Sequence, residues 1–167
     1  MKMKIDRRAF LGLGGAAMAV GVAAIMAGPG PGAAQQPLRF PYRLTEAQWR
    51  RRLNPTQFAI LRQGVTERAG TSLLDREHRR GTFLCAGCGN PLYSSAAKFD
   101  SGTGWPSFFR PLPRGVVTRE DRSLMMARTE VLCARCGGHL GHVFDDGPPP
   151  TGLRYCMNGG AMLFRPA

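Results

Sequence analysis

The sequence predicts a small, mainly β domain of antiparallel strands with short helices at its N-terminal side. Three observations favour this fold class. Helix-start signals are confined to residues 45–64, short apolar or alternating runs follow from residue 81 onward, and glycine and proline separate these runs. A chain of 167 residues is long enough for one domain with a hydrophobic core and short for two.

Two patterns predict the helices. Residues 45–48 have the Thr-x-x-Gln form of a capping box, so a short helix should begin there. Asn54 followed by Pro55 predicts a second helix, because asparagine caps a helix and proline suits its first position. Gly64 predicts the end of this helix. Its expected apolar side consists of Phe58, Ile60 and Leu61.

The strands are expected later in the chain. Residues 82–85 predict a strand that enters a tight turn, and residues 161–165 predict a final strand. Residues 124–133 alternate with period two, which is typical of a strand with one buried side.

Four of the five cysteines form two pairs with a two-residue gap, in the similar segments CAGCGN and CARCGG. These cysteines are Cys85, Cys88, Cys133 and Cys136. The gap lets both thiolates of a pair face one ion at about 2.3 Å, and two pairs complete a closed, structural tetrahedral site. The sequence therefore predicts one structural zinc ion. Two disulfides, or an iron ion on the same thiolates, are the alternatives.

The fifth cysteine, Cys156 in the segment RYCMN, has no such pair. On a strand, Arg154 and Asn158 would project from the same side as Cys156, and the guanidinium would lower the pKa of the thiol. His139 and His142 can act as proton donors near neutral pH. Cys156 is therefore a candidate nucleophile, with a buried, unreactive cysteine as the alternative.

The segments CAGC, KFDSGTGWPSF, CARCGGHLGHVFDDGPPPTGLRYCMN and AMLF, in about residues 45–166, resemble the B-type methionine-R-sulfoxide reductases. The resemblance implies a β-tent domain of two antiparallel sheets with N-terminal helices, and a zinc ion on the side away from the active site. It implies thiol-dependent reduction of methionine-R-sulfoxide, free or in proteins, through a sulfenic acid on Cys156. The implied site residues are Cys156, His142, His139 and Asn158 as catalytic, Trp105, Arg154 and Phe108 as substrate-binding, and Asp145 as supporting.

The chemistry needs a nucleophile and an acid on one substrate, because the sulfoxide oxygen leaves poorly unless it is protonated. Trp105 would offer an apolar wall to the ε-methyl group and so select one epimer. Many relatives carry a resolving cysteine, often at the position of Thr103 here. The sulfenic acid should therefore be reduced by an external thiol, such as a thioredoxin-like protein. Gly159, where serine is common, and the segment GVTERAGTSLL also depart from the usual pattern.

Residues 1–34 are expected to be an export signal, residues 35–44 a linker, and residues 45–167 the reductase domain. A charged start, an apolar run and small residues follow one another, and the string DRRAFLGLG resembles a twin-arginine signal. The expected product is a periplasmic monomer without stable membrane insertion. An uncleaved membrane anchor is the alternative.

The formal net charge of +12 favours a solvated basic surface over a nucleic-acid site, because aromatic residues do not interleave with the arginines. A non-catalytic zinc-knuckle module that binds a peptide is the main rival reading. It explains the paired cysteines but not the combination of Cys156, Trp105 and the two histidines.

Overall fold

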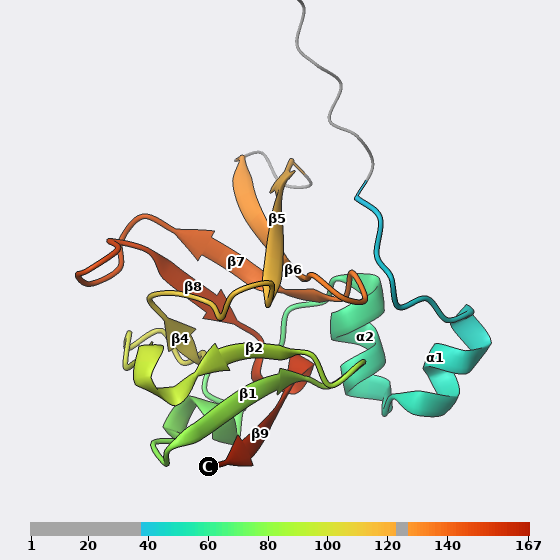
Figure 1. Cartoon of the computed structure of the whole chain (residues 1–167), viewed down its shortest axis with the longest axis horizontal. Helices are drawn as coiled ribbons and strands as arrows, with labels where there is room; N and C mark the ends of the chain where they lie inside the picture. Colours follow the sequence, from blue (N-terminus) through green and yellow to red (C-terminus); the bar gives the residue numbers. More distant parts are fainter. Residues whose placement is uncertain (1–37, 123–126) are drawn as a thin grey trace, which may run out of the picture. The chain divides into compact units, whose positions relative to one another are not determined.

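The computed structural model describes residues 38–122 and 127–167, and the structural statements that follow concern these residues. The expected export signal and residues 35–37 of the linker lie outside them, as do residues 124–126 of the expected strand. Residues 38–167 form one compact unit (Figure 1). Within the described ranges, no helix has the length and apolar character needed to cross a membrane.

Both predicted helices are confirmed. Helix α1 (Glu46–Arg52) begins after Thr45, and helix α2 (Pro55–Gln63) begins after Asn54. Each cap side chain accepts a hydrogen bond from the backbone N–H three residues on, which satisfies a donor that the first helical turn leaves free. Gly64 ends α2 with a φ of +72°, a left-handed conformation that glycine adopts without strain. The expected apolar side is buried at Phe58, Ile60 and Leu61.

The prediction of a mainly β domain with two antiparallel sheets is confirmed (Figure 1). The smaller sheet has the order β2-β1-β9, with β1 (Gly81–Cys85), β2 (Pro91–Ser94) and β9 (Met162–Pro166). The larger sheet has the order β3-β4-β8-β7-β6-β5. Its strands are β3 (Lys98–Phe99), β4 (Ser107–Phe108), β5 (Val116–Asp121), β6 (Arg128–Cys133), β7 (His139–Phe144) and β8 (Arg154–Met157). Short 3-10 helices are η1 (Leu73–Arg76), η2 (Ser95–Ala97) and η3 (Gly159–Ala161).

Strand β6 does not have the single buried side that its alternation predicts. Its last four residues, 130–133, are all buried. Val131 and Cys133 belong to the main hydrophobic core. Glu130, on the opposite side of the strand, is buried through its contacts with His139 and Arg119. An interior strand with a buried, hydrogen-bonded carboxylate on one side thus departs from the simple pattern.

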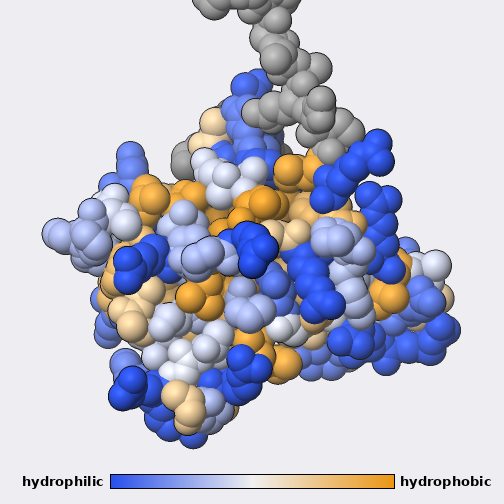
Figure 2. All heavy atoms as spheres, viewed as in Figure 1, coloured by the Kyte–Doolittle hydropathy of each residue, from blue (hydrophilic) through white to orange (hydrophobic). Residues whose placement is uncertain are grey.

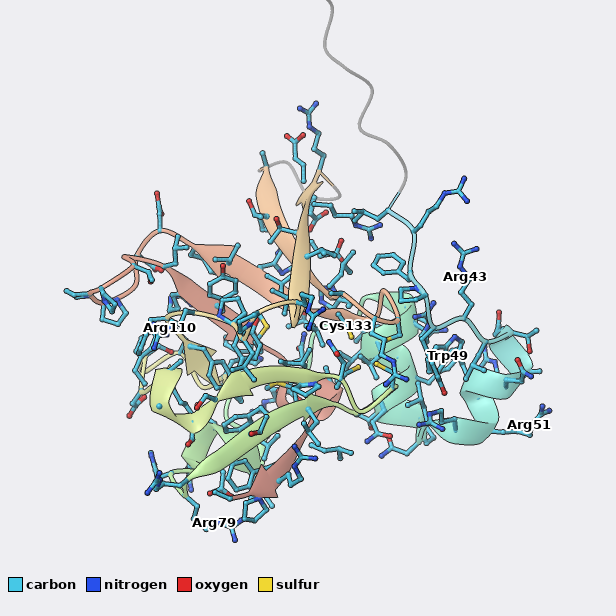
Figure 3. All side chains as sticks on the ribbon, in the orientation of Figure 1. Arg43, Trp49, Arg51, Arg79, Arg110 and Cys133 are labelled. Carbon is cyan, nitrogen blue, oxygen red and sulfur yellow. The ribbon has the colours of Figure 1, made fainter. Side chains whose placement is uncertain are left out.

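The exposed surface is polar and basic. Figure 2 shows hydrophilic side chains over much of the visible face, with apolar residues between them. Arg43, Arg51, Arg79 and Arg110 lie at separate places on the periphery (Figure 3). This spacing is typical of solvated charges rather than of one phosphate-binding patch.

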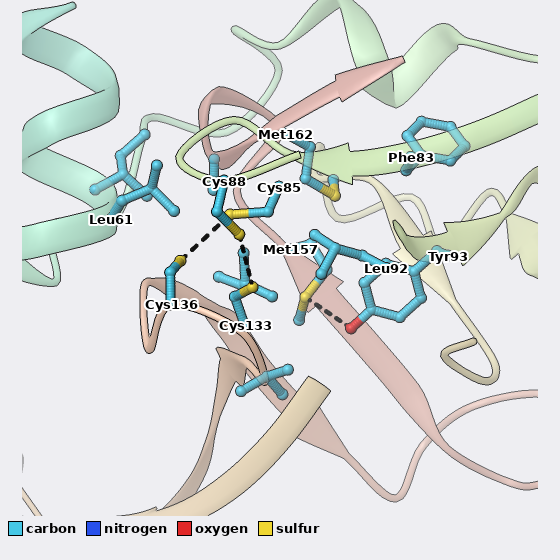
Figure 4. Packing of buried hydrophobic residues seen from close by; sticks show 14 of the residues in the cluster. Leu61, Phe83, Cys85, Cys88, Leu92, Tyr93, Cys133, Cys136, Met157 and Met162 are labelled. Atoms are coloured by element: carbon cyan, nitrogen blue, oxygen red, sulfur yellow. Dashed lines mark hydrogen bonds between the residues drawn. The ribbon is translucent and has the colours of Figure 1, made fainter. Parts of the chain in front are cut away.

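An aromatic stack joins the two sheets in the core. The ring of Phe108 from β4 stacks on Tyr93 from β2 with centroids 4.3 Å apart, and it meets the edge of Phe83 from β1 at 4.9 Å. The hydroxyl of Tyr93 donates a hydrogen bond to Sδ of Met157 in β8 at 3.1 Å (Figure 4). Phe108 is therefore a core residue, and its assignment as a substrate-binding residue is wrong. Its side chain is 0% exposed. Because successive residues of β4 point to opposite sides of the sheet, Phe108 points into the core, away from the side that carries the thiol of Cys156.

Replacing Phe108 by alanine should lower the free energy of unfolding by about 3–5 kcal/mol, because the substitution leaves a cavity between the sheets. Urea unfolding of the metal-loaded protein measures this loss. Phe109→Ala is the matched control, since Phe109 is only half-buried and contacts the exposed Arg110. Equal losses in the two variants would contradict the role given to Phe108.

Candidate active site and thiolate cluster

The four paired cysteines meet in one buried cluster. Cys85 ends β1 and Cys88 lies in the turn after it, while Cys133 ends β6 and Cys136 lies in the turn after that strand. All four sulfur atoms lie within 4.8 Å of one another (Figure 4). Two of the sulfur–sulfur distances are 3.7 Å, between Cys85 and Cys136, and 3.6 Å, between Cys88 and Cys133.

These distances fit a metal ion and do not fit disulfides. A sulfur–sulfur bond is about 2.05 Å long, whereas a tetrahedron with arms of about 2.3 Å has edges of about 3.8 Å. A divalent cation held by the four sulfurs would stabilise their thiolate forms. The cluster can therefore hold one metal ion in a closed site.

Guanidinium groups tie this cluster to the helices and to its own turns. Three of them donate to carbonyl oxygens of the turns: Arg52 to Gly87 at 2.6 Å, Arg62 to Cys136 at 3.2 Å, and Arg135 to Cys88 at 3.0 Å. Because Arg52 and Arg62 extend from α1 and α2, the helices brace the turns that present the thiols. The positive charges also suit a tetrathiolate site, whose net charge with a divalent ion is negative.

Cys156 lies in a separate pocket of about 160 Å³. Four of the residues that the sequence singled out line this pocket: Trp105, His142, Cys156 and Asn158. Four further residues complete its wall: Thr66, Arg128, Gly141 and Phe144. The structure thus brings the candidate nucleophile, one histidine, the tryptophan and the asparagine around one opening.

The β ladder places polar groups on both sides of Cys156. In the larger sheet its Cα is paired with Ser107 of β4 on one side and with His142 of β7 on the other. The hydroxyl of Thr103 is 3.9 Å from Sγ of Cys156. Gly141 allows β7 to approach closely, because a Cβ there would lie 2.1 Å from the carbonyl oxygen of Cys156.

Burial controls the protonation of Cys156. It raises the pKa of the thiol, and this effect outweighs the lowering by Thr103, Arg154 and Ser107. Arg154 therefore acts in the direction that the sequence predicts without setting the net shift. Its guanidinium makes two 2.8 Å hydrogen bonds to Asp146, so its charge is shared with a carboxylate. In the free protein, Cys156 is mainly a neutral thiol near neutral pH.

The two histidines have different places. His142 lines the pocket, and its Nε2 is 2.9 Å from Oδ2 of Asp121. Burial lowers the pKa of His142, and the carboxylate of Asp121 opposes this shift. His139 is buried, and its Nδ1 is 2.7 Å from Oε1 of Glu130. The ring centroids of His139 and His142 are 5.5 Å apart. Nε2 of His139 has no hydrogen-bond partner among the described residues.

The supporting role assigned to Asp145 is not matched by its contacts. Strand β7 ends at Phe144, and Asp145 is exposed beyond it. The carboxylate that reaches Arg154 is that of its neighbour Asp146. The turn after β7 thus brings the carboxylate of Asp146, and not that of Asp145, to Arg154.

Several site residues were missed from the sequence. Ser107, rather than Phe108, lies on the same side of the larger sheet as the thiol of Cys156. Its position two residues after Trp105 could have indicated this, because alternate residues of a strand share one side. Asp121 of β5 contacts His142 of β7, and Glu130 of β6 contacts His139 of β7. The signal there was charge complementarity: Arg119 is opposite Glu130, and Asp121 is opposite Arg128.

Comparison with known proteins gives consistent matches. The family model described as the SelR domain matches residues 53–166. A relative from Bradyrhizobium diazoefficiens, named peptide methionine sulfoxide reductase MsrB, is 58% identical over 123 residues, which is 73% of this chain and 88% of that protein. A protein of the same name from Thiobacillus denitrificans is 57% identical over 123 residues, covering 73% of this chain and 93% of its own length.

Alkylation of Cys156 by iodoacetamide should accelerate with rising pH, with a midpoint above the ordinary thiol value of 9.0, because burial disfavours the thiolate. Arg154→Leu removes a group that lowers this pKa, so the midpoint should rise further and the rate at pH 8 should fall. Peptide mapping by mass spectrometry follows Cys156 alone, and Arg110→Leu is the control. A midpoint below 9.0, or one unmoved by Arg154→Leu, would contradict this picture.

Proposed function

The chain belongs to the SelR-domain family of peptide methionine sulfoxide reductases, and we propose that its Cys156 pocket reduces the R epimer of methionine sulfoxide. The protein is an oxidoreductase that reduces methionine sulfoxide to methionine and so repairs oxidised proteins. One observation carries the assignment of the site. Of the five cysteines, four are gathered in the buried cluster, and only Cys156 opens to a pocket that also contains Trp105 and His142.

Cys156 supplies the nucleophile of the proposed reaction. Its sulfur attacks the electrophilic sulfoxide sulfur, the oxygen passes to the cysteine, and methionine leaves. The products are one methionine and one Cys156 sulfenic acid, a two-electron oxidation of the enzyme for a two-electron reduction of the substrate. Two external thiols then reduce the sulfenic acid, releasing water and a disulfide.

His142 carries the proton in this scheme. Its Nε2, beside the Asp121 carboxylate, is the nitrogen suited to bear hydrogen, which leaves Nδ1 as an acceptor. Because Cys156 enters as a neutral thiol, its proton can pass through His142 to the sulfoxide oxygen. The proton is thus delivered to the leaving oxygen as the thiolate forms, without a permanently charged thiolate in the free protein.

Trp105 is suited to bind the substrate methyl group. Its indole Nε1 donates to the carbonyl oxygen of Glu67 at 3.1 Å, which fixes the ring at the edge of the pocket. A fixed aromatic face offers the ε-methyl group an apolar contact while the polar groups near Cys156 receive the oxygen. Only one arrangement of methyl, oxygen and main chain meets both demands, which supports selectivity for one epimer.

Cys156→Ser should reduce turnover of the R-sulfoxide of a peptide to background, because a hydroxyl cannot form the sulfenic acid. Separate R and S epimers, assayed by chromatographic detection of methionine, measure this. Thermal unfolding and metal content should match the wild type, since Cys156 lies outside the thiolate cluster. Retained turnover would overturn the role of Cys156, and wild-type activity on the S epimer alone would overturn the assignment of the substrate.

We propose that the thiolate cluster holds one structural zinc ion. The sulfur spacing and the closed set of four thiols support this, and a closed site leaves no position for substrate. Metal analysis should give one zinc per chain, and Cys133→Ser should lose both the ion and most of the stability, because metal binding is coupled to folding. A red, iron-containing protein would contradict the choice of zinc.

We propose that an external thiol, such as that of a thioredoxin-like protein, completes the cycle. The hydroxyl of Thr103, at the position where many relatives carry a resolving cysteine, lies 3.9 Å from Sγ of Cys156 and cannot form a disulfide. The other four cysteines are buried in the cluster. No thiol of the described chain is therefore available to resolve the sulfenic acid without disturbing the proposed metal site.

Thr103→Cys should place a resolving thiol beside Cys156, because the side chains already approach to 3.9 Å. After one turnover without added reductant, this variant should contain a disulfide between the introduced cysteine and Cys156. Non-reducing peptide mapping detects the disulfide. Thr118→Cys, at an exposed position in β5, is the control and should form none. An internal disulfide of Cys156 in the oxidised wild type would contradict the need for an external thiol.

We also propose that residues 1–34 direct export to the periplasm and are then removed, leaving the linker 35–44 and a monomeric reductase domain, residues 45–167. The twin-arginine-like string and the order of charged, apolar and small residues support this. N-terminal sequencing of the periplasmic fraction tests removal, and sedimentation tests the monomer. An intact Met1 in the membrane fraction would favour the anchored alternative.

A further inference from the structure

The segment after α2 makes an unusual set of contacts at one residue, Glu67. Its backbone N–H donates to Oδ1 of Asn158 at 2.9 Å, and its carbonyl oxygen accepts from Nε1 of Trp105 at 3.1 Å. Its carboxylate accepts from the backbone N–H groups of Gly159 at 2.5 Å and Gly160 at 2.8 Å. Both Trp105 and Asn158 line the pocket of Cys156. Glu67 thus contacts both Trp105 and Asn158, two residues in the wall of the Cys156 pocket.

The carboxylate of Glu67 caps a helix from a distant part of the chain. The 3-10 helix η3 begins after Asn158, but the side chain of Asn158 makes no capping hydrogen bond. The first N–H groups of a helix need an acceptor, and Glu67 supplies two oxygens for them. The amide of Asn158 is therefore free for other partners.

Two hydrogen bonds of this amide determine how Asn158 faces the pocket. Its Oδ1 accepts from the N–H of Glu67, and its Nδ2 donates to the carbonyl oxygen of Leu140 at 3.1 Å. An oxygen held by an N–H donor cannot exchange places with the amide nitrogen without losing both hydrogen bonds. Glu67 therefore sets the orientation of the amide that the sulfoxide would meet.

Close packing allows this arrangement. A Cβ at position 159 would lie 1.7 Å from Oγ of Ser72, which belongs to the segment after α2. Only glycine therefore fits at position 159. The N–H of Gly70 also donates to the carbonyl oxygen of Gly104 at 2.7 Å, next to Trp105. The segment of residues 64–74 thus contacts both the loop that carries Trp105 and the turn that follows Asn158. Gly159 and this segment are places where the sequence departs from the usual family pattern.

We propose that Glu67 is a positioning residue for the sulfoxide reduction, joining the wall that carries Trp105 to the wall that carries Asn158. The role rests on the proposed function. Its backbone makes the contacts with the pocket residues, but its carboxylate anchors that backbone to residues 159–160. Removing the carboxylate frees two N–H groups and lets the backbone of residue 67 shift, so Trp105 and Asn158 lose their fixed places together.

Glu67→Ala, Glu67→Gln and the control Glu77→Ala test this role. Glu77 also accepts a backbone N–H, from Arg79, but neither residue lines the pocket. Turnover of an R-sulfoxide peptide gives kcat and KM. Alkylation of Cys156 by iodoacetamide reports the thiol, and the emission of Trp105 in a Trp49→Phe background reports the indole.

Glu67→Ala should lower kcat/KM by about 10-fold to 100-fold, because small misplacements of positioning groups have effects of this size. Glu67→Gln should be intermediate, since an amide oxygen can serve only one of the two N–H groups well. The Trp105 emission should shift in Glu67→Ala. The alkylation rate and the metal content should not change, because Glu67 contacts neither Cys156 nor the cluster. Glu77→Ala should match the wild type in every measurement.

Two results would overturn the proposal. One is kcat/KM of Glu67→Ala within twofold of an active wild type. The other is a parallel loss of turnover, Cys156 alkylation and metal, which would mean general unfolding rather than positioning. A wild type inactive on both epimers would instead contradict the proposed function. In that case an unshifted Trp105 emission in Glu67→Ala would overturn the contact role, and a shifted emission would support it.

Discussion

The meeting of four buried sulfur atoms is the constraint on which the rest of the structure depends. One pair of thiols ends β1 of the smaller sheet, and the other ends β6 of the larger sheet. A single ion bound by both pairs would hold the two sheets together at this point. Strand β7 follows directly from the second turn, and β8 is paired with β7. The pairing of β7 with β8 places His142 opposite Cys156, so one strand connects the thiolate cluster with the pocket.

The same arrangement divides the cysteines by role. Four are gathered with spacings that suit a tetrahedral ion, while Cys156 opens to a pocket with hydroxyl groups and a histidine beside it. Burial keeps Cys156 neutral in the free protein, since it raises the pKa of the thiol more than Arg154 and the hydroxyls lower it. A neutral thiol brings with it the proton that the sulfoxide oxygen needs. In the proposed reaction the site would couple attack to proton delivery, which suits a leaving group that departs only when it is protonated.

Local signals in the sequence predicted local features. The helix caps at Thr45 and Asn54, the paired cysteines, and the mainly β fold with two sheets all follow from short patterns and from the family resemblance. Contacts between residues far apart in the sequence were harder to predict. The place of Ser107 against Cys156, the contact of Asp146 with Arg154 and the capping by Glu67 require partners separated along the chain. No spacing rule states which residues a distant strand or loop will meet.

The central claim is that one thiol reacts while four thiols hold the metal. The most direct test is a single turnover of the mature protein with a limiting R-sulfoxide peptide and no reductant. Methionine formed, zinc retained and the oxidation state of each cysteine are measured together. We expect one methionine per oxidised Cys156, a sulfenic acid trapped there by dimedone, and full retention of zinc. A disulfide between Cys156 and a cluster cysteine, formed with release of zinc, would contradict the account.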